Sequence, residues 1–316
     1  MIAVAGFNTA IDRLFRVEHF EAGQVSRAID EHVYPGGKGL HVAQTIAALG
    51  ERVQLVGLID RAHRNLVGQR MAERGVLFHG IEIDDDLRTC IAVRDTSGRI
   101  SEVLGRGPLI GEKTQDALRS AFWRAVDEST VAVLSGSLPH GMPVSTYADL
   151  VLGVRAQGKH CIVDASGEVL RESMAAVPYL VKPNRDEAQA LLGYRIGDVD
   201  AAARAVRDLQ ARGIATPVLS LGAQGAMAGH GQDIWHAELL IDGVRNTVGS
   251  GDCLLAGMIV AFRRGMSTPD ALALGVACGA ANALQEETGW VERDVVESLR
   301  SRVRVRPWTA DFAQRS

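Results

Sequence analysis

Short, continuous hydrophobic runs alternate with longer segments of helical periodicity along most of this chain. The runs are apolar throughout rather than at every second position, which is typical of strands buried on both faces. We predict strands at residues 2–5, 54–58, 131–135, 160–164, 179–181 and 217–220. We predict helices at residues 38–49, 65–74, 114–126, 143–157, 185–192 and 199–212. This β–α alternation predicts an α/β fold with a mostly parallel central sheet covered by helices.

Two regions break this rhythm, residues 11–34 and 87–104, and both show partial period-two alternation. Thr96-Ser-Gly98 provides a turn signal within the second region. We predict a small antiparallel sheet that stands off the main one as a lid or a dimer interface. An ordinary extension of the main sheet is the alternative. Because no linker or repeat is visible, we expect one domain over residues 1–316.

Composition excludes several functional classes. The formal net charge is −4 and aromatic residues make up 5% of the 316 residues, so we expect no nucleic-acid partner. The four cysteines are far apart, which argues against a disulfide scaffold or a zinc ribbon. No run of about 18 apolar residues is present, so we expect no membrane span. Together these features predict a cytoplasmic protein.

The strongest chemical signal is Asn246-Thr-Val-Gly-Ser-Gly-Asp252, which leads directly into a helical pattern. Free backbone N–H groups at such a helix N-terminus, together with the helix dipole, bind anions such as phosphate. The carboxylate of Asp252 is then placed to act as a base toward an incoming hydroxyl. A plain N-cap aspartate after a glycine turn is the structural alternative.

A second glycine-rich entry to a helix is Tyr34-Pro-Gly-Gly-Lys-Gly-Leu-His41. It is not a P-loop, because Gly39 follows Lys38 where that motif requires Ser or Thr. The chain has 34 Lys plus Arg residues but only four lysines, so the retention of Lys38 and Lys182 favours a site that needs a compact ammonium. A tight turn with a solvated lysine remains the alternative for Lys38.

Two further segments lie where predicted strands end. Asn184 and Glu187 in Lys182-Pro-Asn-Arg-Asp-Glu187 are three residues apart on a first helical turn, so they point toward one place. They could hold Mg²⁺ through water, or form a simple capping box. The segment 219–225 leaves a strand through a glycine turn, which suits either a nucleotide or a hairpin.

Together these segments resemble PfkB-type carbohydrate kinases of the ribokinase superfamily, over nearly the whole chain. The marks of the resemblance are Gly36-Gly37-Lys38-Gly39, Lys182-Pro-Asn-x-x-Glu187, Ser220-x-Gly-x-x-Gly225 and Thr247-x-Gly-Ser-Gly-Asp252. Finer marks resemble the 1-phosphofructokinase and tagatose-6-phosphate kinase branch: residues 134–141, Asp164-Ala-Ser-Gly167 and residues 279–284. The resemblance implies a ribokinase-like three-layer αβα fold with a β lid.

The resemblance also implies roles for individual residues. Asp252 matches the catalytic base, and Gly249, Ser250 and Gly251 match an anion hole. The implied substrate contacts are Asp12, Gly36, Gly37, Lys38, His41, Arg88 and Ser137. The implied nucleotide contacts are Lys182, Asn184, Ser220, Gly222, Gly225 and Asn282. Asn184 and Glu187 match a Mg²⁺ pair, ATP is the implied co-substrate, a K⁺ requirement is left open, and a homodimer through the lid sheet is implied.

Three positions depart from the family pattern. His41 stands where Asn is usual, Thr9 stands where Pro is common, and the lid segment reads Leu87-Arg-Thr-Cys90. We expect His41 and Thr89 to face the sugar. An imidazole in place of an amide adds a titratable group and changes the hydrogen-bond geometry, so these departures bear on which sugar is bound.

The reaction expected from these observations is ATP-dependent phosphorylation of a phosphohexose, because two cations at Lys38 and Arg88 suit an anionic substrate. Fructose 1-phosphate is the first expectation, followed by tagatose 6-phosphate or fructose 6-phosphate, then a neutral sugar or nucleoside. A weakly catalytic sugar or nucleotide sensor is the alternative of a different class. A dehydrogenase is disfavoured because no G-x-G-x-x-G follows the first strand.

Overall fold

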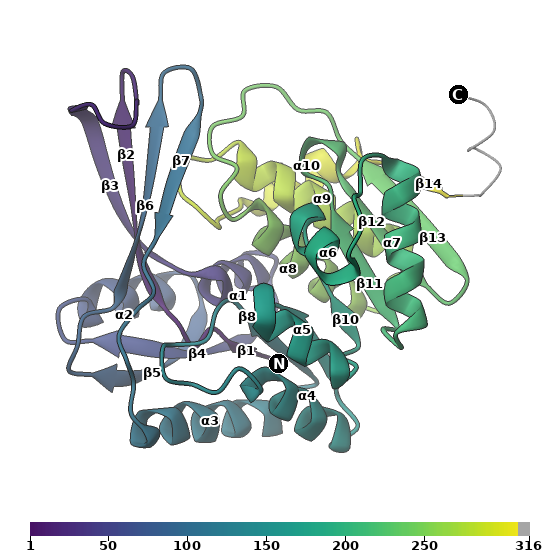
Figure 1. Ribbon diagram of the computed structural model, residues 1–316, viewed down its shortest axis with the longest axis horizontal. Coiled ribbons are helices and arrows are strands. Elements are labelled where there is room, and N and C mark those ends of the chain that lie inside the picture. Colours follow the sequence, from purple (N-terminus) through teal and green to yellow (C-terminus); the bar gives the residue numbers. More distant parts are fainter. Residues whose placement is uncertain (309–316) are drawn as a thin grey trace.

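The computed structural model describes residues 1–308 and contains two sheets (Figure 1). The larger sheet has the strand order β14-β13-β12-β11-β10-β9-β8-β1-β4-β5. Its strands are β1 (Ile2–Ala5), β4 (Val53–Asp60), β5 (Val76–Ile83), β8 (Val131–Ser135), β9 (His160–Asp164), β10 (Leu180–Val181), β11 (Thr216–Ser220), β12 (Ala226–His230), β13 (Asp233–Glu238) and β14 (Arg304–Pro307). From β5 to β11 neighbouring strands are parallel, and β12 to β14 add antiparallel strands at one edge.

Helices cover both faces of this sheet, as the β–α alternation predicts. The helices are α1 (Lys38–Ala48), α2 (Arg64–Glu73), α3 (Glu112–Asp127), α4 (Thr146–Ala156), α5 (Gly167–Ala175), α6 (Arg185–Leu192), α7 (Val199–Ala211), α8 (Ser250–Arg263), α9 (Thr268–Ala283) and α10 (Arg293–Arg300), with a 3₁₀ turn η1 (Gly222–Gln224). Helices α1, α8, α9 and α10 pack against one another in sequence, and so do α4 to α7. The three-layer α/β fold is thereby confirmed.

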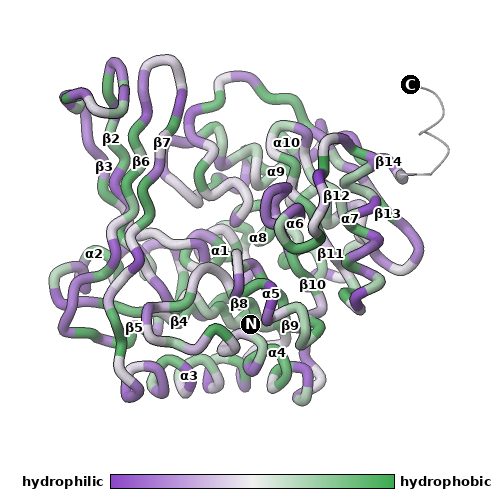
Figure 2. Tube along the Cα trace, viewed as in Figure 1, coloured by the Kyte–Doolittle hydropathy of each residue, from purple (hydrophilic) through white to green (hydrophobic). Residues whose placement is uncertain are grey.

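Burial explains why the strands could be recognised. All four residues of β1 and all eight of β4 are buried, so no polar alternation is required along them. Figure 2 shows hydrophobic residues along these central strands and polar residues along exposed faces of the outer helices. No described helix is long and apolar enough to cross a membrane.

The smaller sheet, which we call the lid, projects from one side of the molecule (Figure 1). Its strands are β2 (Ala10–Val17), β3 (Ala28–Gly36), β6 (Arg88–Asp95) and β7 (Ile100–Leu104), in the order β3-β2-β6-β7. The predicted separate small sheet is confirmed as two antiparallel hairpin-like pairs, β2–β3 and β6–β7. The structure adds that β2 and β6 join these pairs in parallel register, which places Asp12 opposite Cys90.

Close packing of two glycines fixes the start of α1 against the end of β1. A Cβ at Gly39 would lie 2.3 Å from the Cα of Gly6, which is well inside van der Waals contact. We expect Gly39→Ala to lower the free energy of unfolding by about 1–3 kcal/mol, because overpacking forces backbone shifts. Urea denaturation measures this loss.

The matched control is Gly68→Ala in α2, where a Cβ would meet nothing within 4 Å. We expect this variant to gain about 0.5–1 kcal/mol, because alanine restricts the unfolded chain and favours the helix. A Gly39→Ala variant as stable as Gly68→Ala would contradict the tight contact.

Candidate active site

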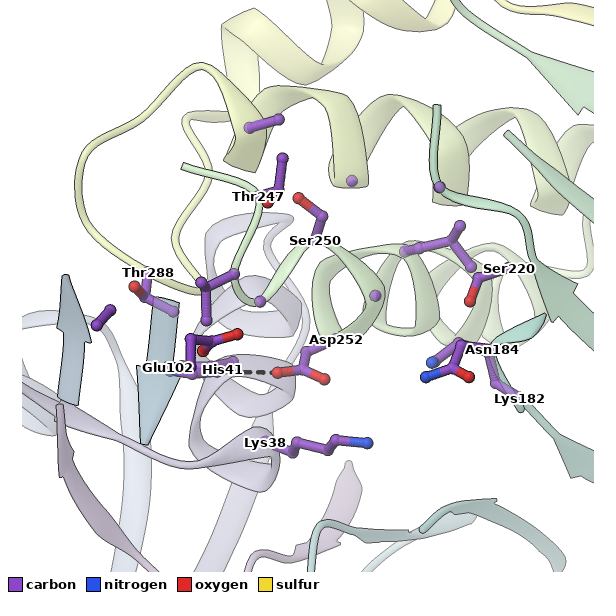
Figure 3. A pocket seen from close by; sticks show the side chains of 18 of the residues that line it. Lys38, His41, Glu102, Lys182, Asn184, Ser220, Thr247, Ser250, Asp252 and Thr288 are labelled. Carbon is purple, nitrogen blue, oxygen red and sulfur yellow. Dashed lines mark hydrogen bonds and ion pairs between the residues drawn. The ribbon is translucent and has the colours of Figure 1, made fainter. Parts of the chain in front are cut away.

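A cavity of about 1040 Å³ lies where the lid faces the carboxyl ends of the parallel strands. Ligands in open α/β sheets bind at this edge. The N-termini of α1 and α8, the inner side of β6 and β7, and the ends of β8, β10 and β11 contribute to the lining. Figure 3 shows ten labelled side chains there, which come from segments far apart in the sequence. The cavity is therefore the place to look for the predicted site residues.

Asp252 lies in the first turn of α8 and is 6% exposed. Gly249 caps the helix in the left-handed conformation with φ +80°, which a side chain would strain. The N–H of Ser250 donates to the carbonyl of Thr247 at 3.2 Å, whereas the N–H groups of Gly249 and Gly251 have no backbone acceptor within residues 1–308. Two of the three predicted amides are thus available to an anion at this helix N-terminus.

His41 connects two carboxylates across the cavity wall. Its Nδ1 lies 2.9 Å from Oδ2 of Asp252, and its Nε2 lies 3.2 Å from Oδ2 of Asp12. The ring is deeply buried, which disfavours its charge, but the two carboxylates overcome that penalty and raise the pKa of His41 to about 9. His41 is therefore an imidazolium at neutral pH, with its Nδ1 toward Asp252 (Figure 3) and its Nε2 toward Asp12.

Asp164 at the end of β9 pairs with both motif lysines. Its side chain is fully buried, and its oxygens lie 3.5 Å from Nζ of Lys38 and 3.4 Å from Nζ of Lys182. The negative charge of Asp164 raises the pKa of Lys38 well above its usual range, against the effect of burial. Lys182 also lies against the anion-binding turn, because a Cβ at Gly251 would meet its Nζ at 3.3 Å. Both ammonium groups are thus held at the cavity.

Arg88 reaches from the lid toward the end of β1. Its Nε donates to the carbonyl of Asn8 at 3.0 Å, and Asn8 Nδ2 donates to Oγ of Ser137 at 3.0 Å. Arg88, Ser137 and Gly37 all line the cavity. Gly36 does not line it, but a Cβ there would overlap the Asp12 carboxylate at 2.1–2.3 Å, so Gly36 makes room for Asp12.

The structure places Thr89 away from the cavity, against the expectation that it faces the sugar. Thr89 is exposed, whereas its neighbours Arg88 and Cys90 line the cavity. Alternate residues of a strand point to opposite faces, so the position next to Arg88 must point away from the cavity.

The predicted nucleotide turn joins β11 to β12 at the other end of the cavity. Ser220, Gly222 and Gly225 all line it. Gly225 has φ +80°, and a Cβ there would lie 1.9 Å from the carbonyl oxygen of Ala237, so only glycine fits. Apolar side chains form the adjoining wall: Leu239, Leu240, Ile241, Val244, Val276, Ala280 and Ala283. This end of the cavity is suited to a flat apolar ring beside a polar backbone.

Asn184 and Glu187 form the capping box that was one of the two predicted readings. Asn184 Oδ1 accepts from the N–H of Glu187 at 2.8 Å, and Glu187 Oε2 accepts from the N–H of Asn184 at 2.9 Å. The second oxygen of Glu187 lies 3.9 Å from Nζ of Lys38 and stays available to other ligands. No group of three or more His, Cys, Asp or Glu side chains suited to a metal occurs among the described residues.

Asn282 has a place behind the cavity wall rather than in it. It is fully buried, and it is absent from the cavity lining. Its Nδ2 donates to the carbonyl of Val248 at 2.8 Å and its Oδ1 accepts from the N–H of Gly289 at 2.7 Å. In this placement both ends of the amide support the loops around Asp252, and the nucleotide contact of Asn282 stays a prediction.

Three residues of the site carried no assigned role in the sequence analysis. Glu102 on β7 lines the cavity, and its burial, together with the charges of Asp12 and Asp252, raises its pKa. Gly289 touches the His41 ring, since a Cβ there would lie 2.2 Å from Cδ2. Asp164 entered the sequence comparison only within the segment Asp164-Ala-Ser-Gly167, with no role of its own. Nothing local in the sequence signals these contacts, which join distant segments.

Comparisons with known proteins identify the family of this chain. The model of the pfkB family carbohydrate kinases matches residues 2–292. The tagatose-6-phosphate kinase of Staphylococcus epidermidis is 30% identical over 308 residues, which cover 96% of this chain and 99% of the relative. The solved structure of phosphofructokinase-2 from Escherichia coli in complex with substrates and products has a TM-score of 0.88 at 25% identity, covering 95% of this chain and 98% of that one.

A further solved structure, described as a possible 1-phosphofructokinase of Thermotoga maritima, has a TM-score of 0.87 at 19% identity and covers 98% and 99% of the two chains. At that identity the likeness concerns the fold alone. The family match spans most of the chain and includes every glycine-rich segment of the cavity. The chain belongs to the pfkB family of carbohydrate kinases, which are phosphotransferases.

Proposed function

We propose that this protein transfers the γ-phosphate of ATP to a hydroxyl of a phosphohexose. The observation that carries the proposal is the division of the cavity into two ends by the α8 N-terminus. Arg88 lies at the lid end beside the carbonyl of Asn8, and the β11–β12 turn with the apolar wall lies at the other end beside Asn184. Lys38 reaches from α1 to Asp164 and Glu187 between them. An anionic sugar fits the first end and an adenosine fits the second, with the phosphates between them at the anion-binding turn.

Asp252 is the proposed general base. The sugar hydroxyl gives its proton to the Asp252 carboxylate while its oxygen forms a bond to the γ-phosphorus, and the bond from that phosphorus to the ADP oxygen breaks. The N–H groups of Gly249 and Gly251, together with Lys182, face the charge on the transferred group. In phosphoryl transfer such positioning and charge stabilisation supply most of the catalysis.

A divalent metal accompanies ATP in this proposal, and Mg²⁺ is the candidate. Carboxylate and amide oxygens suit Mg²⁺, which usually keeps several waters. The capping box occupies one oxygen of Glu187 and leaves the other, so contact with the metal through water fits the residues present. When bound, the metal neutralises charge on the polyphosphate. A K⁺ requirement stays open; one solved structure of Escherichia coli phosphofructokinase-2 is described as a complex with potassium.

The lid is the proposed cover for the sugar end and the proposed dimer interface. Arg88 and Glu102 on the lid already line the cavity, so closure would exclude water from the reacting groups. Several large apolar side chains of the lid region are exposed: Val25, Ile29, Val103 and Leu104. Exposed apolar residues at both edges of the lid support a homodimer contact there.

Turnover across a substrate panel tests the proposal. The acceptors are fructose 1-phosphate, tagatose 6-phosphate, fructose 6-phosphate, free hexoses and nucleosides, with ATP and Mg²⁺ in a coupled ADP-release assay. We expect turnover with at least one phosphohexose and little with neutral acceptors. We expect Lys38→Met to raise KM for the phosphosugar about tenfold to a hundredfold, because a charged contact to phosphate is lost.

Lys113→Met is the matched control, because Lys113 is exposed on α3 away from the cavity. This variant should keep the wild-type KM. Turnover with neutral acceptors alone would contradict the phosphate site, and ATP binding without turnover of any acceptor would favour the sensor alternative.

A further inference from the structure

Contacts with neighbouring residues hold the imidazole of His41. Gly289 lies against its Cδ2 edge, where a Cβ would approach to 2.2 Å. The carbonyl of Gly289 accepts from Gln44 Nε2 at 2.6 Å, so the backbone of that loop is tied to the same helix as His41. Its two nitrogens lie within 3.2 Å of Asp252 and Asp12, so contacts on three sides hold the ring.

The charges around His41 match one imidazolium between two carboxylates. Side-chain exposure is 5% for His41, 8% for Asp252 and 17% for Asp12, so water screens the three groups weakly. A neutral imidazole carries no charge and one N–H, whereas the imidazolium can donate from Nδ1 to Asp252 and form an ion pair with Asp12 at Nε2. The other titratable groups on the surrounding walls are Lys38 on α1, Tyr34 on β3, Arg88 and Cys90 on β6, and Glu102 on β7.

Neither cation among these groups forms an ion pair with Asp12 or Asp252 within residues 1–308, although the charge of Asp252 contributes to the raised pKa of Lys38. Lys38 pairs with Asp164 and Glu187, and Arg88 donates to backbone carbonyls of Asn8 and Gly105. Glu102 adds a further acid to the same wall. Loss of the His41 proton would therefore leave Asp12, Asp252 and Glu102 near one another without an ion-paired cation, and like charges in a poorly solvated site repel strongly.

We propose that His41, as an imidazolium, is a positioning residue that ties the substrate-binding carboxylate of Asp12 to the base Asp252, so that turnover requires the His41 proton. This inference rests on the proposed function. Oδ2 of Asp252 is held by His41, and Oδ1 makes no hydrogen bond within residues 1–308. The hydroxyl proton therefore passes to Oδ1, while His41 keeps both of its protons and remains paired with Asp12.

The inference predicts that the pH profile of kcat has an alkaline limb, caused by loss of the His41 proton. Because the pKa of His41 is raised to about 9, the imidazolium persists at neutral pH and is lost as pH rises through that value. We expect wild-type kcat to fall above about pH 9. We expect His41→Asn to lower kcat about tenfold to a hundredfold at pH 7.5, because Asp252 would no longer be held in position. The variant should also lack the alkaline limb.

His19→Asn is the control, since the His19 side chain is 69% exposed in the lid loop. It should keep the wild-type kcat and the wild-type limb. A limb that persists unchanged in His41→Asn, or a kcat within twofold of wild type at pH 7.5, would overturn the role of His41.

A readout independent of activity separates this inference from the proposed function. Side-chain ¹⁵N NMR of histidine-labelled protein should show one imidazole that titrates near pH 9 and is absent from His41→Asn. A His41 resonance that titrates near the ordinary value of about 6.5 overturns the inference even if phosphosugars are turned over. If the resonance titrates near pH 9 but no acceptor is phosphorylated, the bridge exists, and the proposed function fails together with the catalytic role of His41.

Discussion

Replacing Asp252 by Asn is expected to lower kcat by about a hundredfold to ten-thousandfold. The amide has nearly the shape of the carboxylate, but it cannot accept the proton of the attacking hydroxyl. The variant also removes a negative charge beside His41, whose Nδ1 lies 2.9 Å from Asp252. The coupled ADP-release assay measures the loss of turnover. Isothermal titration calorimetry should show that ATP binding is retained, because the N–H groups of Gly249 and Gly251 are unchanged.

Asp270→Asn is the matched control for Asp252→Asn. Asp252 is the third residue of α8 and Asp270 is the third residue of α9, so both carboxylates interact with a helix N-terminus. Asp270 is exposed, and its helix begins away from the cavity. Both variants therefore lose a negative charge at a helix N-terminus, but only Asp252→Asn also loses the proposed base. If kcat of Asp252→Asn stays within a few fold of the control, the base lies elsewhere.

The interior of the large sheet could be predicted because its strands are buried on both faces. β1, β8 and β9 match their predicted bounds, and α6 matches its own. Strand β5 at one edge and the antiparallel strands β12 and β13 near the other edge were not predicted. β5 mixes buried and exposed positions without a regular period, and β12 contains Gly229 and a terminal His230 that weaken a strand pattern. Continuous burial leaves a signal in the sequence, whereas a sheet edge is defined by its neighbours.

The candidate site divides in the same way. Glycine-rich turns at Gly37, Gly222 and Gly249 could be predicted because each requires a positive φ and leaves a local pattern. The pairing of His41 with Asp252 joins residues 211 positions apart, and that of Lys38 with Asp164 joins residues 126 apart. Such pairs depend on how α1, β9 and α8 are placed in the fold. Motif spacing therefore predicted most of the residues that the fold gathers at the cavity, but not their partners.

Asp164→Asn is expected to lower the free energy of unfolding by about 3–5 kcal/mol, because it leaves a buried ammonium without its counter-charge. Lys182 is 4% exposed and lies 3.4 Å from Asp164, so water cannot take over the lost interaction. Lys38 loses the same partner but retains Glu187 at 3.9 Å. Urea denaturation measures the loss. Asp116→Asn is the control, since that side chain is 73% exposed on α3 and should change stability by less than about 0.5 kcal/mol.

Two further measurements distinguish an unpaired charge from a local packing defect at Asp164. The double variant Asp164→Asn with Lys182→Met should recover much of the lost stability, because removing both partners leaves no buried charge. ATP should stabilise Asp164→Asn more than it stabilises the wild type, since its phosphates supply the missing negative charge beside Lys182. A double variant no more stable than Asp164→Asn, with equal stabilisation by ATP, would show that the carboxylate does not act through the lysines. In that case the contact between Asp164 and Lys182 would not contribute to stability, and the loss in Asp164→Asn would come from local packing.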